Sequence, residues 1–147
     1  MHYSEYETIY VMKPEVPEDA LRAIHEKLDG IIERFQGHIL VRDDWGKRKL
    51  AYPVKKNSKG HYLYVNYLGP TDLVLELERN LRIDANLLRF LTVKLDVDVD
   101  VEEKLAQAAE KRARLAEAAA RRRADEEAGD HDDMDDDHDS DDELDAD

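Results

Sequence analysis

"KRKLAYPVKKNSKGHYLYVNYLG" spans residues 47–69 and decides the fold. Two runs of aliphatic and aromatic residues, 47–54 and 61–68, flank the polar segment 55–60, which predicts two strands joined in a hairpin. The stretch also holds six Lys and Arg residues, four tyrosines and His61, in a chain with a formal net charge of −14. Such a hairpin either binds anionic groups or is only a solvated run of charge.

The segments before the hairpin predict one strand, one helix and the start of a second strand. Residues 3–12 are rich in aromatic and β-branched types, which favours a strand. Apolar residues then recur at helical spacing over 18–36, and Gly37 follows the last of them as a stop signal. A strand over 38–45 is expected to continue into the hairpin, with a bulge or a twist at Gly46.

The segments after the hairpin repeat the pattern of helix and strand. Thr71 is predicted as the N-cap of a second helix that ends near Leu81, and residues 87–95 read as a fourth strand. The order is therefore β-α-β-β-α-β. It predicts an α+β, ferredoxin-like fold, with a four-stranded antiparallel sheet and both helices on one face.

The chain divides into three parts by composition. Residues 1–100 are the predicted ferredoxin-like domain, and residues 101–124 are a charged helical extension, either solvent-exposed or formed only conditionally. The segment 125–147 contains fifteen Asp and Glu residues and no Lys or Arg. It has almost nothing to bury, so it is predicted to be a disordered acidic tail. The net charge of the whole chain therefore says little about the charge of residues 1–100.

Several classes of protein are disfavoured. The chain has no cysteine, which removes disulfides, thiolate metal sites and cysteine nucleophiles. It lacks a run of the roughly 18 apolar residues that a membrane span needs, and its first residues do not form a secretory signal. No histidine pair has metal-ligand spacing, and no serine lies in a nucleophile motif. We expect a cytoplasmic, non-enzymatic protein without metal, cofactor, membrane contact or small-molecule substrate.

Both faces of the predicted sheet carry apolar side chains. If Leu63, Val65 and Tyr67 point toward the helices, Tyr62 and Tyr64 point away from them. A monomer rarely leaves such a surface in water, so a partner protein, a stack of RNA bases or a second copy is expected to cover it. The candidate residues on this face are Ile9, Val11, Tyr62, Tyr64, Leu91 and Val93.

An RNA-recognition motif has the same element order and is one alternative. Its third strand begins with a Lys-Gly or Arg-Gly pair and carries spaced aromatic residues, and residues 59–67 (KGHYLYVNY) match this only with one inserted residue. An insertion in a strand moves every later side chain to the other face. The match therefore does not preserve the geometry of that motif.

Four segments in order resemble the bacterial small-subunit ribosomal protein six family: YETIYVMKP (6–14), WGKRKLAYPVKK (45–56), KGHYLYVNY (59–67) and LLRFLTVK (87–94). The resemblance covers about residues 3–95. It implies a ferredoxin-like fold and a structural role in the small ribosomal subunit. It also implies binding to the central domain of the small-subunit ribosomal RNA, together with ribosomal protein eighteen, and no catalysis.

Basic residues on this fold can neutralise RNA phosphates without reading sequence. The candidates are Lys47, Arg48, Lys49, Lys55, Lys56, Lys59, Arg79, Arg82, Arg89 and Lys94. The six apolar candidates named above are then the expected contact for ribosomal protein eighteen. The alternative is a self-associating ferredoxin-like regulatory module that does not bind RNA. The acidic tail either serves solubility alone or competes with non-cognate RNA.

Overall fold

The computed structural model describes residues 2–133 of the chain. It separates into two compact units, one ending at Ala108 and one beginning at Ala109. The first unit contains the whole sheet and its two covering helices. The second contains the remainder of a long C-terminal helix.

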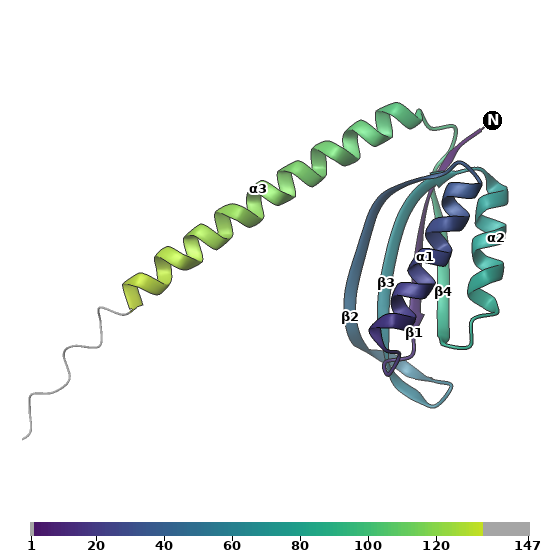
Figure 1. Cartoon of the computed structure of the whole chain (residues 1–147), viewed down its shortest axis with the longest axis horizontal. Helices are drawn as coiled ribbons and strands as arrows, with labels where there is room; N and C mark the ends of the chain where they lie inside the picture. The colour runs from purple at the N-terminus through teal and green to yellow at the C-terminus, as the bar shows by residue number, and fades with distance from the viewer. Residues whose placement is uncertain (1, 134–147) are drawn as a thin grey trace, which may run out of the picture. The chain divides into compact units, whose positions relative to one another are not determined.

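The first unit is the predicted ferredoxin-like domain. Its strands are β1 (Ser4–Met12), β2 (His38–Val54), β3 (Asn57–Gly69) and β4 (Leu87–Asp96), in the order β2-β3-β1-β4 with antiparallel neighbours. The helices α1 (Glu18–Arg34) and α2 (Thr71–Arg82) lie side by side on one face of the sheet (Figure 1). The predicted β-α-β-β-α-β fold is confirmed.

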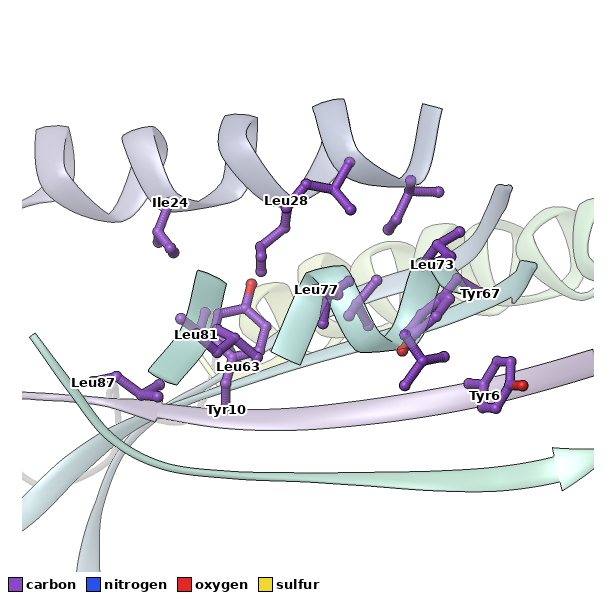
Figure 2. Packing of buried hydrophobic residues seen from close by; sticks show 14 of the residues in the cluster. Tyr6, Tyr10, Ile24, Leu28, Leu63, Tyr67, Leu73, Leu77, Leu81 and Leu87 are labelled. Atoms are coloured by element: carbon purple, nitrogen blue, oxygen red, sulfur yellow. The ribbon is translucent and has the colours of Figure 1, made fainter. Parts of the chain in front are cut away.

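The main core lies between the sheet and these two helices. Ile24 and Leu28 of α1 point toward the sheet, as do the leucines of α2, and they meet Tyr10 and Leu63 from the central strands (Figure 2). The buried Thr8 hydroxyl is 2.9 Å from the Tyr67 hydroxyl, so this polar group is satisfied within the core. The predicted inward face of β3 is confirmed.

The hairpin turn is tighter than predicted. The chain reverses over Lys55 and Lys56, whose φ angles are 47° and 67°, and β3 begins already at Asn57. Two successive positive φ angles suit a two-residue turn that matches the twist of the strands. The Asn57 amide donates to the carbonyl oxygens of Val54 and Lys55 and holds this turn. The predicted six-residue turn over 55–60 is therefore wrong.

Glycine acts in two different ways in the domain. Gly46 has a φ of +79° where the β2–β3 register shifts, which confirms the predicted bulge. Gly37 was predicted to end α1, but Gln36 takes the left-handed position instead, with a φ of 60°. A Cβ at Gly37 would lie 2.5 Å from Leu73 Cδ1, so glycine is needed there for close packing of the chain.

The second helix begins differently from the prediction. Pro70 occupies the N-cap with extended dihedral angles, and Thr71 is the first helical residue. Thr71 makes no side-chain capping bond, so its predicted N-cap role is wrong. A proline before the helix fixes the entry of the chain and has no N–H that needs a partner.

The sheet face opposite α1 and α2 is covered at both ends by the chain itself. At one end, Val101, Leu105 and the buried Ala108 pack with the buried Leu40 and Leu68. At the other end, Val11 and Leu50 form a small buried cluster with Leu88. The extension was predicted to be exposed or only conditionally formed, and this is wrong for residues 101–108, because their apolar side chains cover this end of the sheet.

The helix α3 runs from Val101 to Asp133, beyond the predicted end at 124. The prediction of a disordered segment is therefore wrong for residues 125–133. Glu126, Glu127 and Ala128 are strong helix formers, and the two glutamates stand four residues after Arg122 and Arg123, a spacing that supports a helix. Within the second unit, the side chains of 109–128 are exposed. The rest of the predicted tail, 134–147, lies outside the described residues.

Candidate RNA-binding and partner-binding surfaces

The hairpin places three cationic side chains on neighbouring ladder positions. Lys49 lies directly opposite Lys59, and Lys47 lies opposite His61. Like charges at opposed positions destabilise a sheet unless an anion lies between them. Among the residues that the structure describes, no carboxylate lies within 4 Å of Lys47, Lys49 or Lys59. This surface can therefore accept an external anion.

Two other cations of the hairpin also contact the protein itself. The Lys55 ammonium donates to the carbonyl oxygen of Leu87 at 3.0 Å and links the hairpin to β4. The Arg48 guanidinium lies 5.3 Å from the centroid of the Trp45 ring. Trp45 in turn stacks on Tyr64, with ring centroids 5.4 Å apart. These contacts make the hairpin a supported surface rather than a loose loop.

The second predicted basic set is only partly joined to the hairpin. Arg89 lies 5.3 Å from the ring centroid of Tyr52 on the hairpin, and Arg82 lies 5.4 Å from the ring of Phe90, the residue after Arg89. Arg89 therefore extends the basic surface of the hairpin, whereas Arg82 lies over a ring that packs against the core on the helix side of the sheet. Lys94 lies farther along β4, 5.8 Å from the Tyr6 ring.

Arg79 has a carboxylate partner. Its guanidinium lies 2.7 Å from Glu76 Oε1, and hydrogen bonds from Arg79 and Asn80 lower the pKa of Glu76 to about 2. Arg79 is thus neutralised locally, unlike the hairpin lysines. Its side chain is exposed, as are those of the other nine predicted RNA-binding residues.

An acidic contact at the base of the hairpin was missed by the sequence reasoning. His61 Nε2 lies 2.7 Å from Asp44 Oδ1, and the Gly46 amide donates to the same oxygen at 2.8 Å. Partial burial acts to raise the pKa of Asp44, but these hydrogen bonds hold it below its usual value. The contact crosses the bulge at Gly46, which displaces the register, so strand alternation could not reveal it.

The six predicted partner-binding residues lie together on the sheet face away from α1 and α2. The register pairs Ile9 with both Tyr64 and Leu91, Val11 with Tyr62, and Glu7 with Val93. Leu91 is 60% exposed, whereas Val11 is only 5% exposed. Val11 is therefore covered by its neighbours and adds little exposed area to this surface. A pocket of about 200 Å³ opens here and is lined by Ile9, Val11, Tyr62, Arg89, Phe90 and Leu91.

Two carboxylates also lie on this face. The Tyr64 hydroxyl donates to Glu7 at 2.8 Å, and burial together with this carboxylate raises the pKa of Tyr64 to about 12. Glu5 accepts a hydrogen bond from the Asn66 amide at 3.0 Å. The face is therefore apolar with an acidic border. This combination suits a protein with apolar and cationic side chains better than it suits RNA phosphates.

The described part of the chain offers few other chemistries. Within residues 2–133, no group of three or more His, Asp or Glu side chains is arranged to hold a metal ion. No helix in the described range is long and apolar enough to cross a membrane.

Comparison with known proteins gives one consistent result. The family described as "Ribosomal protein S6" matches residues 5–94. The small ribosomal subunit protein bS6 of Syntrophobacter fumaroxidans is 43% identical over 105 residues, which cover 71% of each chain. The bS6 protein of Nitratidesulfovibrio vulgaris is 42% identical over 102 residues, covering 69% of this chain and 98% of that relative.

A solved structure agrees with these sequence matches. The 30S ribosomal protein S6 of Thermotoga maritima is 27% identical and superposes with a TM-score of 0.59, covering 78% of this chain and 98% of its own. The matched residues include both the basic hairpin and the apolar sheet face. The chain belongs to the bacterial ribosomal protein S6 family.

Proposed function

We propose that this protein is a structural, non-catalytic component of the small ribosomal subunit. It binds the central domain of the small-subunit ribosomal RNA together with ribosomal protein eighteen. Membership of the ribosomal protein S6 family supports the ribosomal location. The observation that carries RNA binding is the cross-strand pair Lys49 and Lys59, which has no carboxylate partner among the described residues.

The hairpin supplies contacts to the phosphate backbone. Lys47, Lys49, Lys56 and Lys59 are exposed. Contacts of this kind neutralise phosphates and fix orientation without reading the base sequence. Arg89 extends the same surface through its contact with the Tyr52 ring. Arg79, Arg82 and Lys94 are further candidates for phosphate contacts.

The apolar sheet face supplies the contact to ribosomal protein eighteen. Exposed apolar side chains such as Leu91 and Val93 mark interaction surfaces when they are contiguous. Tyr64 and Ile9 border them, and the carboxylates of Glu5 and Glu7 would meet cationic groups of the partner. A second copy of this chain could use the same face, which is the alternative function.

The test is a titration of a central-domain RNA fragment with the full chain, with and without ribosomal protein eighteen, over a range of salt. We expect tight binding only with the partner, and a salt slope that corresponds to several phosphates. The variant carrying Lys49→Gln and Lys59→Gln should reduce that slope by about 1.5, because each phosphate contact contributes about 0.7–0.9. No RNA binding with either protein set, together with homodimers in native mass spectrometry, would contradict the proposal.

A further inference from the structure

A second concentration of positive charge lies outside the residues that match the family. Residues 109–123 of α3 contain six cationic side chains and two glutamates, whereas the family match ends at residue 94. All side chains from 109 to 128 are exposed. The cationic residues are Lys111, Arg112, Arg114, Arg121, Arg122 and Arg123. No role in the proposed function uses them.

The helix gathers several of these cations on one stripe. At about 100° per residue, Lys111, Arg114 and Arg121 fall within one side of the helix, and Arg122 lies beside Lys111. Within the described part of the chain, no carboxylate is within 4 Å of Lys111 or of Arg121–Arg123. Arg114 and Glu110 are 3.9 Å apart with side chains 72% and 70% exposed, a pair that contributes little.

Packing does not account for this stripe. The side chains from 109 to 128 are exposed, and Lys111 and Arg114, three residues apart, repel each other. The choice of arginine is also informative. A guanidinium is weakly hydrated and matches the two oxygens of a phosphate, whereas lysine serves equally well for solubility. The arrangement therefore favours a ligand that carries repeated phosphates.

We propose that the basic stripe of α3, residues 111–123, is a second RNA-binding element that contacts the phosphate backbone of the ribosomal RNA. This inference rests on the proposed function, because it assumes that the chain binds RNA. The stripe is joined to the hairpin domain by the same chain, so RNA bound to one element meets the other at a high effective concentration. Three acidic residues, Asp125, Glu126 and Glu127, come shortly after the last arginine. They repel phosphates, so the RNA contact is limited to the residues before 125.

The experiment uses the full chain with ribosomal protein eighteen and a central-domain RNA fragment. In the glutamine variant, Lys111, Arg112, Arg114, Arg121, Arg122 and Arg123 all become Gln, which keeps helix propensity. In the matched control, the five arginines become Lys, which keeps the charge. Affinity is measured from about 50 to 200 mM salt, a range over which about six to ten phosphate contacts change affinity by about 10³–10⁵.

We expect the glutamine variant to bind at least about tenfold more weakly at low salt, with a salt slope smaller by about 2–4, as for three to five lost phosphate contacts. The lysine control should keep the slope. Circular dichroism follows the helix content of each variant. If the glutamine variant loses helix content, the triple variant R121Q/R122Q/R123Q is used instead. Its salt slope should decrease by about half as much, because it removes three of the six cations.

The outcomes separate this inference from the proposed function. If K49Q/K59Q weakens RNA binding and the α3 variants do not, the second element is wrong and the proposed function stands. If the unmodified chain does not bind RNA with its partner, both fail. The stripe could instead hold the acidic segment of a second copy. In that case the chain would form a dimer at low salt, and the glutamine variant would not. The salt slope of RNA binding would be the same for both chains, and this result would overturn the inference.

Discussion

The two faces of the sheet are built from the same alternating strands but are used differently. On one face, α1 and α2 bury a continuous core that includes Tyr10 and Tyr67, both less than 2% exposed. On the other face, the chain covers only the two ends, and Leu91 and Val93 between them are 60% and 38% exposed. The first face stabilises the fold, and the second leaves apolar side chains exposed.

The difference does not lie in hydrophobicity alone. Both faces carry tyrosines, but their hydroxyls have different surroundings. Tyr67 is bonded inside the core to Thr8, whereas Tyr64 is bonded at the surface to Glu7. The core tyrosine is surrounded by aliphatic side chains, and the surface tyrosine by carboxylates and a stacked Trp45. Substitutions on the two faces should therefore affect different measurements.

The largest effect is expected from truncation in the helix-covered core. Leu77 of α2 is fully buried, so Leu77→Ala should lower the free energy of unfolding by about 2–5 kcal/mol through lost burial and the cavity that remains. Leu75, two residues earlier on the same helix and 61% exposed, is the matched control. Leu75→Ala should change stability by less than about 0.5 kcal/mol. Urea unfolding of both variants measures the contrast, and equal effects would contradict this assignment of faces.

The next effect concerns pH and the buried Tyr67. Burial raises the pKa of its hydroxyl to about 12 from the ordinary 10.0. Below pH 10 the hydroxyl is protonated in both states. Between pH 10 and about 12 only the unfolded chain releases the proton, so stability falls as pH rises, by about 2–3 kcal/mol from this group.

The measurement compares the wild-type chain with Tyr67→Phe, which cannot ionise. The stability of the variant should fall less steeply from pH 9 to 12, and the difference between the two curves gives the contribution of Tyr67. Tyr52, 57% exposed on the hairpin, provides the control. Tyr52→Phe should leave the pH dependence unchanged, and parallel curves for all three proteins would show that Tyr67 ionises as freely as an exposed tyrosine.

Strand alternation was sufficient to predict which side chains share a face. It placed Leu63, Val65 and Tyr67 together because side-chain direction repeats every two residues. Alternation could not predict how much of the second face the chain would cover. That depends on the packing of Leu105 and Ala108 against the sheet, which is a tertiary contact between segments far apart in the sequence.

A third prediction tests the use of the second face. Leu91→Ala should weaken binding to ribosomal protein eighteen about tenfold, because exposed apolar residues in the middle of an interface contribute most to affinity. The stability of the free protein should change by less than about 0.5 kcal/mol, since the side chain is mostly in water. Isothermal titration with the partner measures the affinity. Leu75→Ala, equally exposed on the opposite side, should leave it unchanged, and a similar loss in both variants would place the partner elsewhere.

The RNA-binding candidates show a similar limit of sequence reasoning. The hairpin cluster was predictable because its cations are adjacent in sequence and the turn brings the two strands into register. The contact between Arg89 and the hairpin could not be predicted, because Arg89 and Tyr52 lie on two strands that are not neighbours in the sheet. The ion pair between Arg79 and Glu76 could not be predicted either. Most exposed helices contain many opposite charges three or four residues apart, so the spacing alone does not show which of them pair.

The smallest effect concerns Lys104, which holds the start of α3 at one covered end of the sheet. Its ammonium lies 3.0 Å from Glu5 and 3.2 Å from Asp96, and both contacts raise the pKa of Lys104. Lys104→Gln should destabilise the docked segment by about 0.5–1 kcal/mol, the range for partly exposed pairs. Hydrogen exchange at the Val99 amide, which donates to Tyr3 O at 2.9 Å, reports this local opening.

The matched control is Lys111→Gln, on the exposed part of the same helix. Exchange at Val99 should accelerate about two- to fivefold in the Lys104 variant and not at all in the control. Lys104 also contacts Glu5 at the edge of the open sheet face, so its loss leaves that carboxylate without this cationic partner. If Val99 exchanged at the same rate in both variants, the apolar contacts of Leu105 and Ala108 alone would hold the segment, and the limit of the open face would be set by packing rather than by charge.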